Sequence, residues 1–380
     1  MGEYNSVFTV DLSVICGNYQ RIAGACGTTV MPVLKSNAYG HGLSEVALAL
    51  WDAFRVKTFA VAQVSEGVAL REAGISSDIL LLSGAPRHLL GAALDYGLIP
   101  TVFSQEEVAA LESAAGERGL RDCAVHIKIE TGLRRIGVRP GPELEAMAAA
   151  LKQAGRLRLA GTYSHLISGE IMDEALADKQ FSLYMHAVAQ LRALGLEPGM
   201  LHFCNSGGAA WYQKGYLDAV RIGRGLYMGD PETLRGAPYF VDGRLAPEAG
   251  TWQCTVTCVN TVKKGEGIGY GHRLRAQRDM RLAILCVGYG DGLHMELAAR
   301  GCPVLIGGNR ARLMGACMDQ SYVDVTDIPC RAGDEAVLFG ASSQGFRLPS
   351  QELAAAVEDE GVLLTNGLTQ RVERVWTKPM

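Results

Sequence analysis

The stretch Met31-Pro-Val-Leu-Lys35-Ser-Asn-Ala-Tyr39-Gly-His-Gly42 sets the pattern of the first 230 residues. A short apolar strand runs into a polar, glycine-containing loop, and a helical sequence follows. We count eight such strands, separated by helical stretches such as residues 106–118, 144–154 and 174–194. This alternation is typical of βα units and a parallel sheet. The predicted strands span residues 31–35, 59–63, 79–83, 99–103, 125–129, 159–165, 201–205 and 219–222.

Eight βα units predict a (β/α)8 TIM barrel. An open doubly wound sheet is the competing arrangement, but no GxGxxG follows an early strand. After Asp230-Pro231 the pattern changes to short strands at residues 255–262, 281–287, 312–314 and 336–339, with a late helix at 350–357. We therefore expect an N-terminal barrel at residues 1–235 and a C-terminal, mostly β domain at residues 236–380.

Composition favours small-molecule chemistry in a globular protein. The 380 residues carry 36 Lys and Arg against 40 Asp and Glu, a net charge of −4 that provides no general attraction to nucleic acid or anionic lipid. No apolar run approaches the roughly 18 residues of a membrane span, and Glu3 and Asp11 interrupt any signal-peptide core. The ten cysteines show no metal-binding spacing. We expect a cytoplasmic protein with reduced core thiols, no metal, and neither a nucleic-acid nor a membrane partner.

Polar residues at the ends of barrel strands are the first candidates for a site. Lys35 closes an apolar strand, where partial desolvation would lower its pKa and free its amine for a Schiff base. A surface lysine with a buried stem is the alternative. His126, Lys128 and Glu130 share one face of the fifth strand by period-two alternation. A structural ion pair between Lys128 and Glu130 is the competing interpretation.

The loops after strands seven and eight fit a phosphate. Ser206-Gly-Gly and Arg221-Ile-Gly223 lie where barrels of this kind often bind one. Each glycine pair alone would indicate a tight turn. Together with a lysine amine in the same barrel mouth, they predict a phosphorylated carbonyl cofactor, and pyridoxal phosphate fits best.

Seven motifs then carry a family resemblance over nearly the whole chain. They are Val33-Leu-Lys35-Ser-Asn-Ala-Tyr39-Gly-His-Gly42, Lys128-Ile-Glu-Thr-Gly-Leu-Arg-Arg135-Ile-Gly, Asn205-Ser206-Gly-Gly, Arg221-Ile-Gly223, Gly269-Tyr270-Gly271, Gly288-Tyr289-Gly-Asp291-Gly and Cys317-Met318-Asp319-Gln320. The sequence resembles the pyridoxal-phosphate-dependent alanine racemase family. The resemblance implies the barrel and β domain, and a head-to-tail homodimer whose sites combine one subunit's barrel with the other's β domain.

The resemblance also implies catalytic and cofactor-binding roles. Lys35 would form the Schiff base with pyridoxal 5'-phosphate and act as base on one face of the substrate α-carbon, and Tyr270, contributed by the other subunit, would act on the opposite face. Arg221 would face the pyridine nitrogen and bond to His165. The residues implied to hold the phosphate are Tyr39, Ser206, Gly223 and Arg224.

The resemblance also implies which residues contact the substrate. Arg135 would contact the substrate carboxylate and the ring oxygen, and the Met318 backbone would help to bind the carboxylate. Lys128 is a position often carbamylated to support that arginine. Tyr289 and Asp319 would line the entrance.

Departures from the family pattern bear on the substrate. Gln370 stands where a tyrosine commonly touches the phosphate and crowds the substrate methyl, and an amide there could open the pocket or bond a side-chain hydroxyl. Met295 and Gly315 fall where arginines are common, and Ser168-Gly169 replaces an acidic stretch.

The leading hypothesis is an alanine racemase, with a serine or broad-specificity racemase as the alternative. A decarboxylase of basic amino acids would carry a Gly-Gly-Gly phosphate loop and a late catalytic cysteine motif, and neither is present in this sequence. A cofactor-carrying regulatory protein would lack the β domain.

Overall fold

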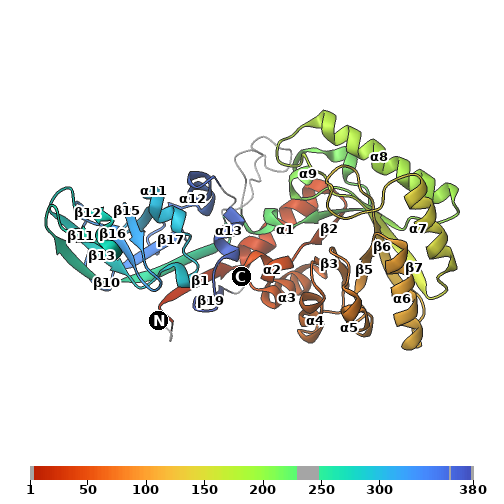
Figure 1. Cartoon of the computed structure of the whole chain (residues 1–380), viewed down its shortest axis with the longest axis horizontal. Helices are drawn as coiled ribbons and strands as arrows, with labels where there is room; N and C mark the ends of the chain where they lie inside the picture. The colour runs from red at the N-terminus through yellow and green to blue at the C-terminus, as the bar shows by residue number, and fades with distance from the viewer. Residues whose placement is uncertain (1–3, 229–247, 359–360, 378–380) are drawn as a thin grey trace. The chain divides into compact units, whose positions relative to one another are not determined.

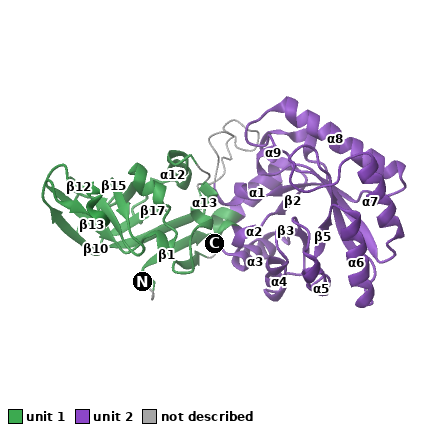
Figure 2. Ribbon diagram, viewed as in Figure 1, with its two compact units in different colours: residues 1–15, 39–41, 246–380 green, residues 16–38, 42–245 purple. Residues whose placement is uncertain are grey.

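The structure, a computed structural model, describes residues 4–228, 248–358 and 361–377, which form two compact units (Figure 1, Figure 2). One unit comprises residues 16–38 and 42–245, and the other comprises residues 1–15, 39–41 and 246–380. The predicted division between residues 235 and 236 lies outside the described residues and stays a prediction.

The first unit is the predicted barrel. Its parallel strands follow the order β2-β9-β8-β7-β6-β5-β4-β3, and a parallel bridge between Val33 and Ala60 joins the two end strands. All eight predicted strands are present. They are β2 (Thr29–Pro32), β3 (Thr58–Val61), β4 (Asp78–Leu81), β5 (Ile99–Val102), β6 (Cys123–Lys128), β7 (Leu157–Tyr163), β8 (Met200–His202) and β9 (Ala219–Ile222).

Helices lie around these strands in Figure 1. Because both faces of a parallel barrel strand are covered, strands such as β3 and β5 are buried along their whole length. The Ser104 and Asp173 side chains cap the first turns of α6 and α8, and Pro142 opens α7. The barrel helices are α1 (Leu12–Cys26), α3 (Leu43–Phe54), α4 (Val64–Glu72), α5 (Leu90–Asp95), α6 (Gln105–Glu117), α7 (Pro142–Gln153), α8 (Glu174–Ala193), α9 (Ser206–Trp211) and α10 (Arg224–Tyr227).

Seven of the eight barrel strands end one to three residues earlier than the sequence predicts, and the largest differences, three residues each, are at β2 and β8. β2 ends at Pro32, because Val33 forms only a single bridge and residues from Lys35 onward enter a turn, designated α2 (Lys35–Tyr39). β8 ends at His202 because Asn205 caps α9. In both cases the functional candidates lie in the loop rather than on the strand.

The second unit is built on an antiparallel sheet. Its order is β18-β17-β14-β15-β16-β13-β10-β1-β19, with a further pairing of β17 with β10. Phe8, Trp252 and Phe339 are buried in its core, with ring centroids 5.9 Å apart for Phe8–Phe339 and for Trp252–Phe339. Its elements are β1 (Ser6–Asp11), β10 (Gly250–Val262), β11 (Gly267–Ile268), β12 (Leu274–Arg275), β13 (Met280–Leu285), α11 (Met295–Arg300), β14 (Pro303–Ile306), β15 (Asn309–Ala316), β16 (Ser321–Asp324), β17 (Glu335–Ala341), β18 (Arg347–Leu348), α12 (Ser350–Ala356), α13 (Gly361–Asn366) and β19 (Glu373–Thr377).

The mostly β character of this region and its late helix are confirmed. The sequence did not predict β1, which pairs antiparallel with β10 and parallel with β19 and so brings the start of the chain into this sheet. Within the described ranges, no helix combines the length and apolar character that crossing a membrane requires. The same ranges contain no group of three or more His, Cys, Asp or Glu suited to a metal ion, and all ten cysteines are free thiols.

Candidate active site

Lys35 lies at the mouth of the barrel, just past β2. The Val33 amide donates to the Ile222 carbonyl at 2.7 Å, and the Leu34 amide donates to the Ala60 carbonyl at 2.8 Å. The segment before Lys35 is therefore bonded to both neighbouring strands, β9 and β3. Because parallel strands all end at this face, the half-buried lysine is delivered to the usual position of a barrel active site.

The turn after Lys35 is left-handed. Ser36, Asn37 and Ala38 have φ values of 54°, 55° and 52°, and Tyr39 continues with 54°. Left-handed helical geometry costs roughly 1–2 kcal/mol per non-glycine residue, so these residues need contacts that hold them. Three hydrogen bonds do so: Ala38 N to Leu34 O at 2.8 Å, Gly42 N to Asn37 O at 3.0 Å, and Leu43 N to Asn37 Oδ1 at 2.8 Å.

The loop after β6 folds back and forms hydrogen bonds at the end of that strand. The Val138 amide donates to the Lys128 carbonyl and the Glu130 amide donates to the Val138 carbonyl, both at 2.9 Å. A Cβ on Gly137 would lie 2.8 Å from the Glu130 nitrogen, so glycine permits this close approach. Arg135 lies on the returning loop and is exposed.

Lys128 is buried in a cationic environment. Burial, with Arg135 and Arg221 nearby, lowers the pKa of its amine to about 7. Its Nζ lies 5.5 Å from the centroid of the Tyr163 ring. The competing interpretation, a Lys128–Glu130 ion pair, is not observed among the described residues, and the Glu130 carboxylate instead accepts from the Gly132 amide.

Arg221 is buried on β9 and contacts the segments that follow β7 and β8. Its guanidinium donates to the Ser164 carbonyl at 2.7 Å and to the Phe203 carbonyl at 3.1 Å, and Nη2 lies 3.5 Å from His165 Nδ1. It also stands over the Tyr163 ring, with Cζ 5.0 Å from the centroid. The arginine thus links the ends of β7, β8 and β9.

Two further histidines lie beneath Arg221. Nδ1 of His126 and Nε2 of His202 are 3.0 Å apart, and the Tyr163 ring stacks on His202 at a centroid distance of 4.7 Å. Burial is the largest cause that lowers the pKa of His126 to about 3 and that of His202 well below its usual range. Both rings are therefore neutral near pH 7. A Cβ on Gly161 would lie 2.4 Å from His126 Cε1, so glycine makes room for this ring.

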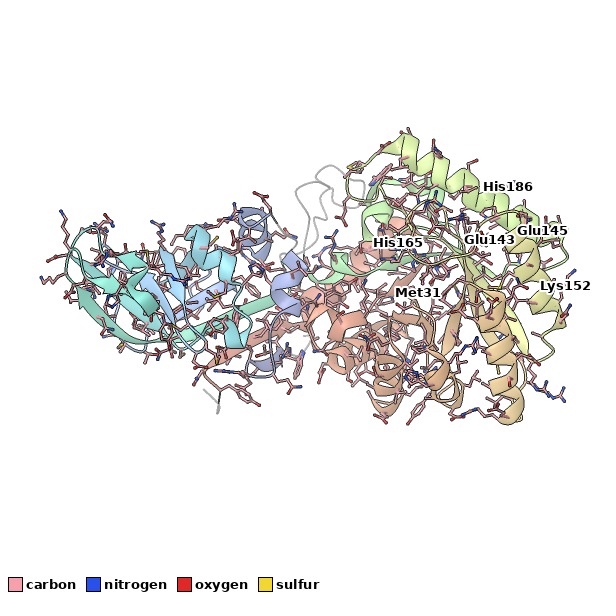
Figure 3. The ribbon with its side chains drawn as sticks, in the orientation of Figure 1. Met31, Glu143, Glu145, Lys152, His165 and His186 are labelled. Atoms are coloured by element: carbon pink, nitrogen blue, oxygen red, sulfur yellow. The ribbon has the colours of Figure 1, made fainter. Side chains whose placement is uncertain are left out.

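His165 lies in the loop after β7, and Ser206 lies after β8, in a loop that the sequence assigned to a phosphate. Asn205 Nδ2 is 3.2 Å from His165 Nε2, and Asn205 Oδ1 accepts from the Gly208 amide at 3.0 Å. The Ser206 hydroxyl accepts from the Gly223 amide at 3.0 Å. The structure thus brings Ser206 and Gly223 together. Figure 3 shows His165 within the barrel, whereas Glu143, Glu145, Lys152 and His186 lie on the outer helices α7 and α8.

The charge of the barrel mouth fits an anionic ligand. Burial, then Arg221, Lys128, Arg135 and Lys35 in that order, lowers the pKa of His165 well below its usual range. The charges of Arg221, Arg135 and Lys35, and of Lys128 in its protonated form, therefore act on one neutral histidine. Such an excess of positive charge, next to a hydroxyl and glycine amides, suits a phosphate or a carboxylate. Arg224 forms an ion pair with Glu170, so its guanidinium already has a partner.

A second set of candidates gathers in the β unit around Arg371. Its guanidinium bridges Asp291 at 3.0 Å and Asp319 at 2.7 Å, and Asp291 is almost fully buried. The Tyr289 amide donates to the Cys317 carbonyl at 3.0 Å, which ties the two loops together. Tyr289, Met318 and Asp319 are thus held side by side, and Gln370, which precedes Arg371, is exposed.

Tyr270 is a strongly exposed candidate. It lies in a short helical turn (Tyr270–His272) between β11 and β12, and 85% of its surface is accessible. Gly269 and Gly271, with φ values of 70° and 64°, allow the chain to reverse on either side of it. An aromatic hydroxyl displayed in this way is available to another surface.

The sequence pointed to most of the charged residues at the barrel mouth, but not to the residues that contact them and hold them in place. The barrel candidates Lys35, Lys128, Arg135, His165, Ser206, Arg221, Gly223 and Arg224 lie at or near the carboxyl ends of the strands. Tyr163, His202 and Asn205 were not assigned this supporting role. The available signal for His202 was a histidine in a short apolar strand, three residues before the polar Asn205-Ser206.

Known proteins resemble nearly the whole chain. Residues 10–231 match the family model described as alanine racemase, N-terminal domain, and residues 249–376 match alanine racemase, C-terminal domain. The alanine racemase of Desulfovibrio desulfuricans is 33% identical over 376 residues, which cover 97% of each protein.

Two solved structures resemble the whole fold. The alanine racemase of Bacillus anthracis with bound L-Ala-P has a TM-score of 0.90 at 28% identity, covering 99% of this chain and 96% of that one. The alanine racemase of Bartonella henselae, described as having covalently bound pyridoxal phosphate, has a TM-score of 0.85 at 25% identity, covering 98% and 99%.

Proposed function

The chain belongs to the alanine racemase family, and we propose from this premise that it interconverts L- and D-alanine with pyridoxal 5'-phosphate as cofactor. The observation that carries the proposal is the placement of Lys35 at the barrel mouth beside buried cations. A lysine amine in cationic surroundings is poised to bind a carbonyl group, and the same charge attracts the phosphate and the substrate carboxylate.

The residues that would hold the cofactor are those that fit its charge. Lys35 would bind it covalently, and Ser206 and Gly223 would hold the phosphate with Tyr39 and the Arg224 backbone. When bound, pyridoxal phosphate supplies a conjugated ring that accepts the electron pair left by the departing α-proton. Arg221 has donors only, so it would offer the pyridine nitrogen a hydrogen bond without giving up its proton.

The proton transfers need two bases, because a single base returns the proton to the face that it came from. We assign Lys35 to one face of the α-carbon and Tyr270 to the other. The exposure of Tyr270 supports its use by a second copy of the chain, in a homodimer whose sites each take a barrel from one subunit and a β domain from the other. Arg135 and the Met318 backbone would bind the substrate carboxylate, while Tyr289 and Asp319 would line the entrance.

Serine, or a broader set of small amino acids, is the alternative substrate. Gln370 supports it, because an amide in place of an aromatic ring would leave room and hydrogen-bonding capacity for a side-chain hydroxyl. The cytoplasmic location and the division into residues 1–235 and 236–380 stay predictions.

Proton exchange at the substrate α-carbon tests the proposal. The purified protein, loaded with pyridoxal phosphate, is incubated in deuterated water with each enantiomer of alanine and of serine. We expect deuterium incorporation and formation of the opposite enantiomer for at least one of them. The Lys35→Ala variant should lose the visible absorbance of the lysine–cofactor bond together with this activity. Wild-type protein that exchanges neither amino acid would contradict the proposal.

A further inference from the structure

We infer that Glu66 is a positioning residue for Lys35. Its carboxylate anchors the left-handed turn that begins directly after the lysine, and so fixes where the amine lies. This inference deepens the proposed function and rests on it, because the position of Lys35 matters to the extent that Lys35 binds a carbonyl.

The contacts of Glu66 span two βα units. Oε1 accepts a hydrogen bond from the Ser36 amide at 2.6 Å. Oε2 accepts from the Ala62 amide at 2.8 Å and from the Gln63 amide at 3.0 Å. One carboxylate therefore ties the start of α4 to the residue after Lys35, across a sequence separation of 30 residues.

The anchored amide belongs to the first residue of the strained turn. The Ala38 amide donates to the Leu34 carbonyl across Lys35 and Ser36, and the Gly42 and Leu43 amides donate to Asn37 further along the chain. All three of these bonds stay within residues 34–43, whereas Glu66 holds the turn from another βα unit. Within the described residues, the Ser36 amide bonds to Glu66. A charged acceptor strengthens such a bond, and strained backbone persists where its surroundings hold it in place.

Without Glu66, the residues after Lys35 could relax toward right-handed geometry. The peptide that carries the lysine would then rotate, and the amine of Lys35 would move with it. A displacement of about 1 Å at a reacting group can cost roughly 100-fold in rate. The effect should therefore appear in the chemistry of Lys35 as well as in stability.

A second glutamate provides a matched control. Glu107 makes the same kind of cap two βα units later: its Oε2 accepts from the Phe103 amide at 2.7 Å, and its own amide donates to the Ser104 hydroxyl at 3.3 Å. Among the described contacts, these stay within its own loop. Glu107→Ala therefore removes a capping carboxylate without touching the turn after Lys35.

The experiment compares Glu66→Ala, Glu66→Gln and Glu107→Ala in the full-length protein. Cofactor-free protein is mixed with pyridoxal phosphate, and the rate of appearance of the visible lysine–cofactor absorbance is measured. Amide hydrogen exchange of the peptide covering residues 34–39 is measured on the same cofactor-free samples. We expect Glu66→Ala to slow attachment at least about tenfold and to speed exchange at residues 36–38. Glu66→Gln should be intermediate, because it keeps one acceptor oxygen, and Glu107→Ala should match wild type in both readouts.

The outcomes separate this inference from the proposed function. Attachment at the wild-type rate and unchanged exchange in Glu66→Ala would overturn the role of Glu66 alone. The role of Glu66 would also be overturned if Glu107→Ala sped hydrogen exchange at residues 34–39 as much as Glu66→Ala does. The effect would then come from the loss of any helix-capping carboxylate and not from the bond between Glu66 and Ser36. If wild-type protein never develops the absorbance, the proposed function fails, and hydrogen exchange still decides whether Glu66 holds the turn. If Glu66→Ala does not fold, Glu66→Gln carries the comparison.

Discussion

The Arg221 guanidinium donates a hydrogen bond from Nη1 to Nδ1 of His202 at 2.8 Å. Because arginine carries donors only, Nδ1 must be the acceptor, and the single proton of the neutral His202 ring lies on Nε2. That proton points at Nδ1 of His126, 3.0 Å away, so the proton of His126 lies on its own Nε2. One buried cation thus sets the tautomers of two histidines in turn.

The burial of His126 makes the stability of the protein depend on pH. Burial lowers its pKa to about 3, whereas in the unfolded chain it is about 6.5. Between these values the unfolded chain binds a proton that the folded protein does not, so the free energy of unfolding falls as the pH falls below about 6.5, by up to about 1.4 kcal/mol per pH unit. We expect His126→Gln to make the measured slope between about pH 6.5 and 4.5 shallower by roughly 1 kcal/mol per unit, as read from urea unfolding.

The control for this measurement is His186→Gln on the outer face of α8, where the ring is exposed (Figure 3). It should leave the slope at the wild-type value. An unchanged slope in His126→Gln would show that His126 is protonated alike in the folded and unfolded chains, contrary to its burial.

The low pKa of Lys128 predicts a reactive amine. With a pKa of about 7, a large fraction of this amine is neutral just above pH 7 and can attack dissolved carbon dioxide, forming a carbamate and releasing a proton. The change from cation to anion is favourable beside Arg135 and Arg221. Carbon-13 NMR of protein in labelled bicarbonate should show one protected carbamate signal that grows as the pH rises through about 7.

Lys128→Met should abolish that signal, whereas Lys152→Met, at an exposed lysine on α7 (Figure 3), should keep it. A protected signal that survives in Lys128→Met belongs to another amine, and carbamylation of Lys128 would then be rejected.

The proposed sharing of active sites between subunits predicts complementation between inactive variants. Lys35→Ala and Tyr270→Ala should each lower kcat/KM at least about 1,000-fold, as the loss of an essential catalytic group does. If each site takes its lysine and its tyrosine from different subunits, unfolding and refolding an equal mixture restores one working site in every mixed dimer. Random pairing then gives roughly a quarter of wild-type activity.

No recovery in the mixture, with dimers confirmed by light scattering, would place both bases on the same chain. Each variant refolded alone is the control and should stay inactive.

The residue at position 370 should set the preference between alanine and serine. Gln370→Tyr restores an aromatic ring, which would fill space next to the substrate side chain. We expect the ratio of kcat/KM for serine to that for alanine to fall roughly tenfold, measured by chiral chromatography of the products. Gln344→Tyr, at an exposed turn of the β unit, should leave the ratio unchanged. A ratio that rises in Gln370→Tyr would contradict the proposed contact.

The barrel strands, and the position of charged residues at their ends, were predictable because each signal is local. Eight short apolar runs define β2 to β9, and a lysine at the end of the first run marks the mouth of the barrel. The supports were not predictable in the same way. The Glu66 carboxylate meets the Ser36 amide across 30 residues, and His126 meets His202 across 76 residues. Neither spacing is a motif, because the barrel closure rather than the sequence separation brings these groups together.

By itself, the sequence determined the order of strands and helices, the polar loop ends, and the chemistry that Lys35 and its neighbours can perform. These follow from residue type and short periodicity, which act over a few residues. The tertiary structure alone decided that β1 joins β10 and β19, that the turn after Lys35 is left-handed, and that Lys128 is buried among cations. Strand partners, strained dihedral angles and shifted pKa values depend on burial and on contacts between distant segments, and folding supplies both.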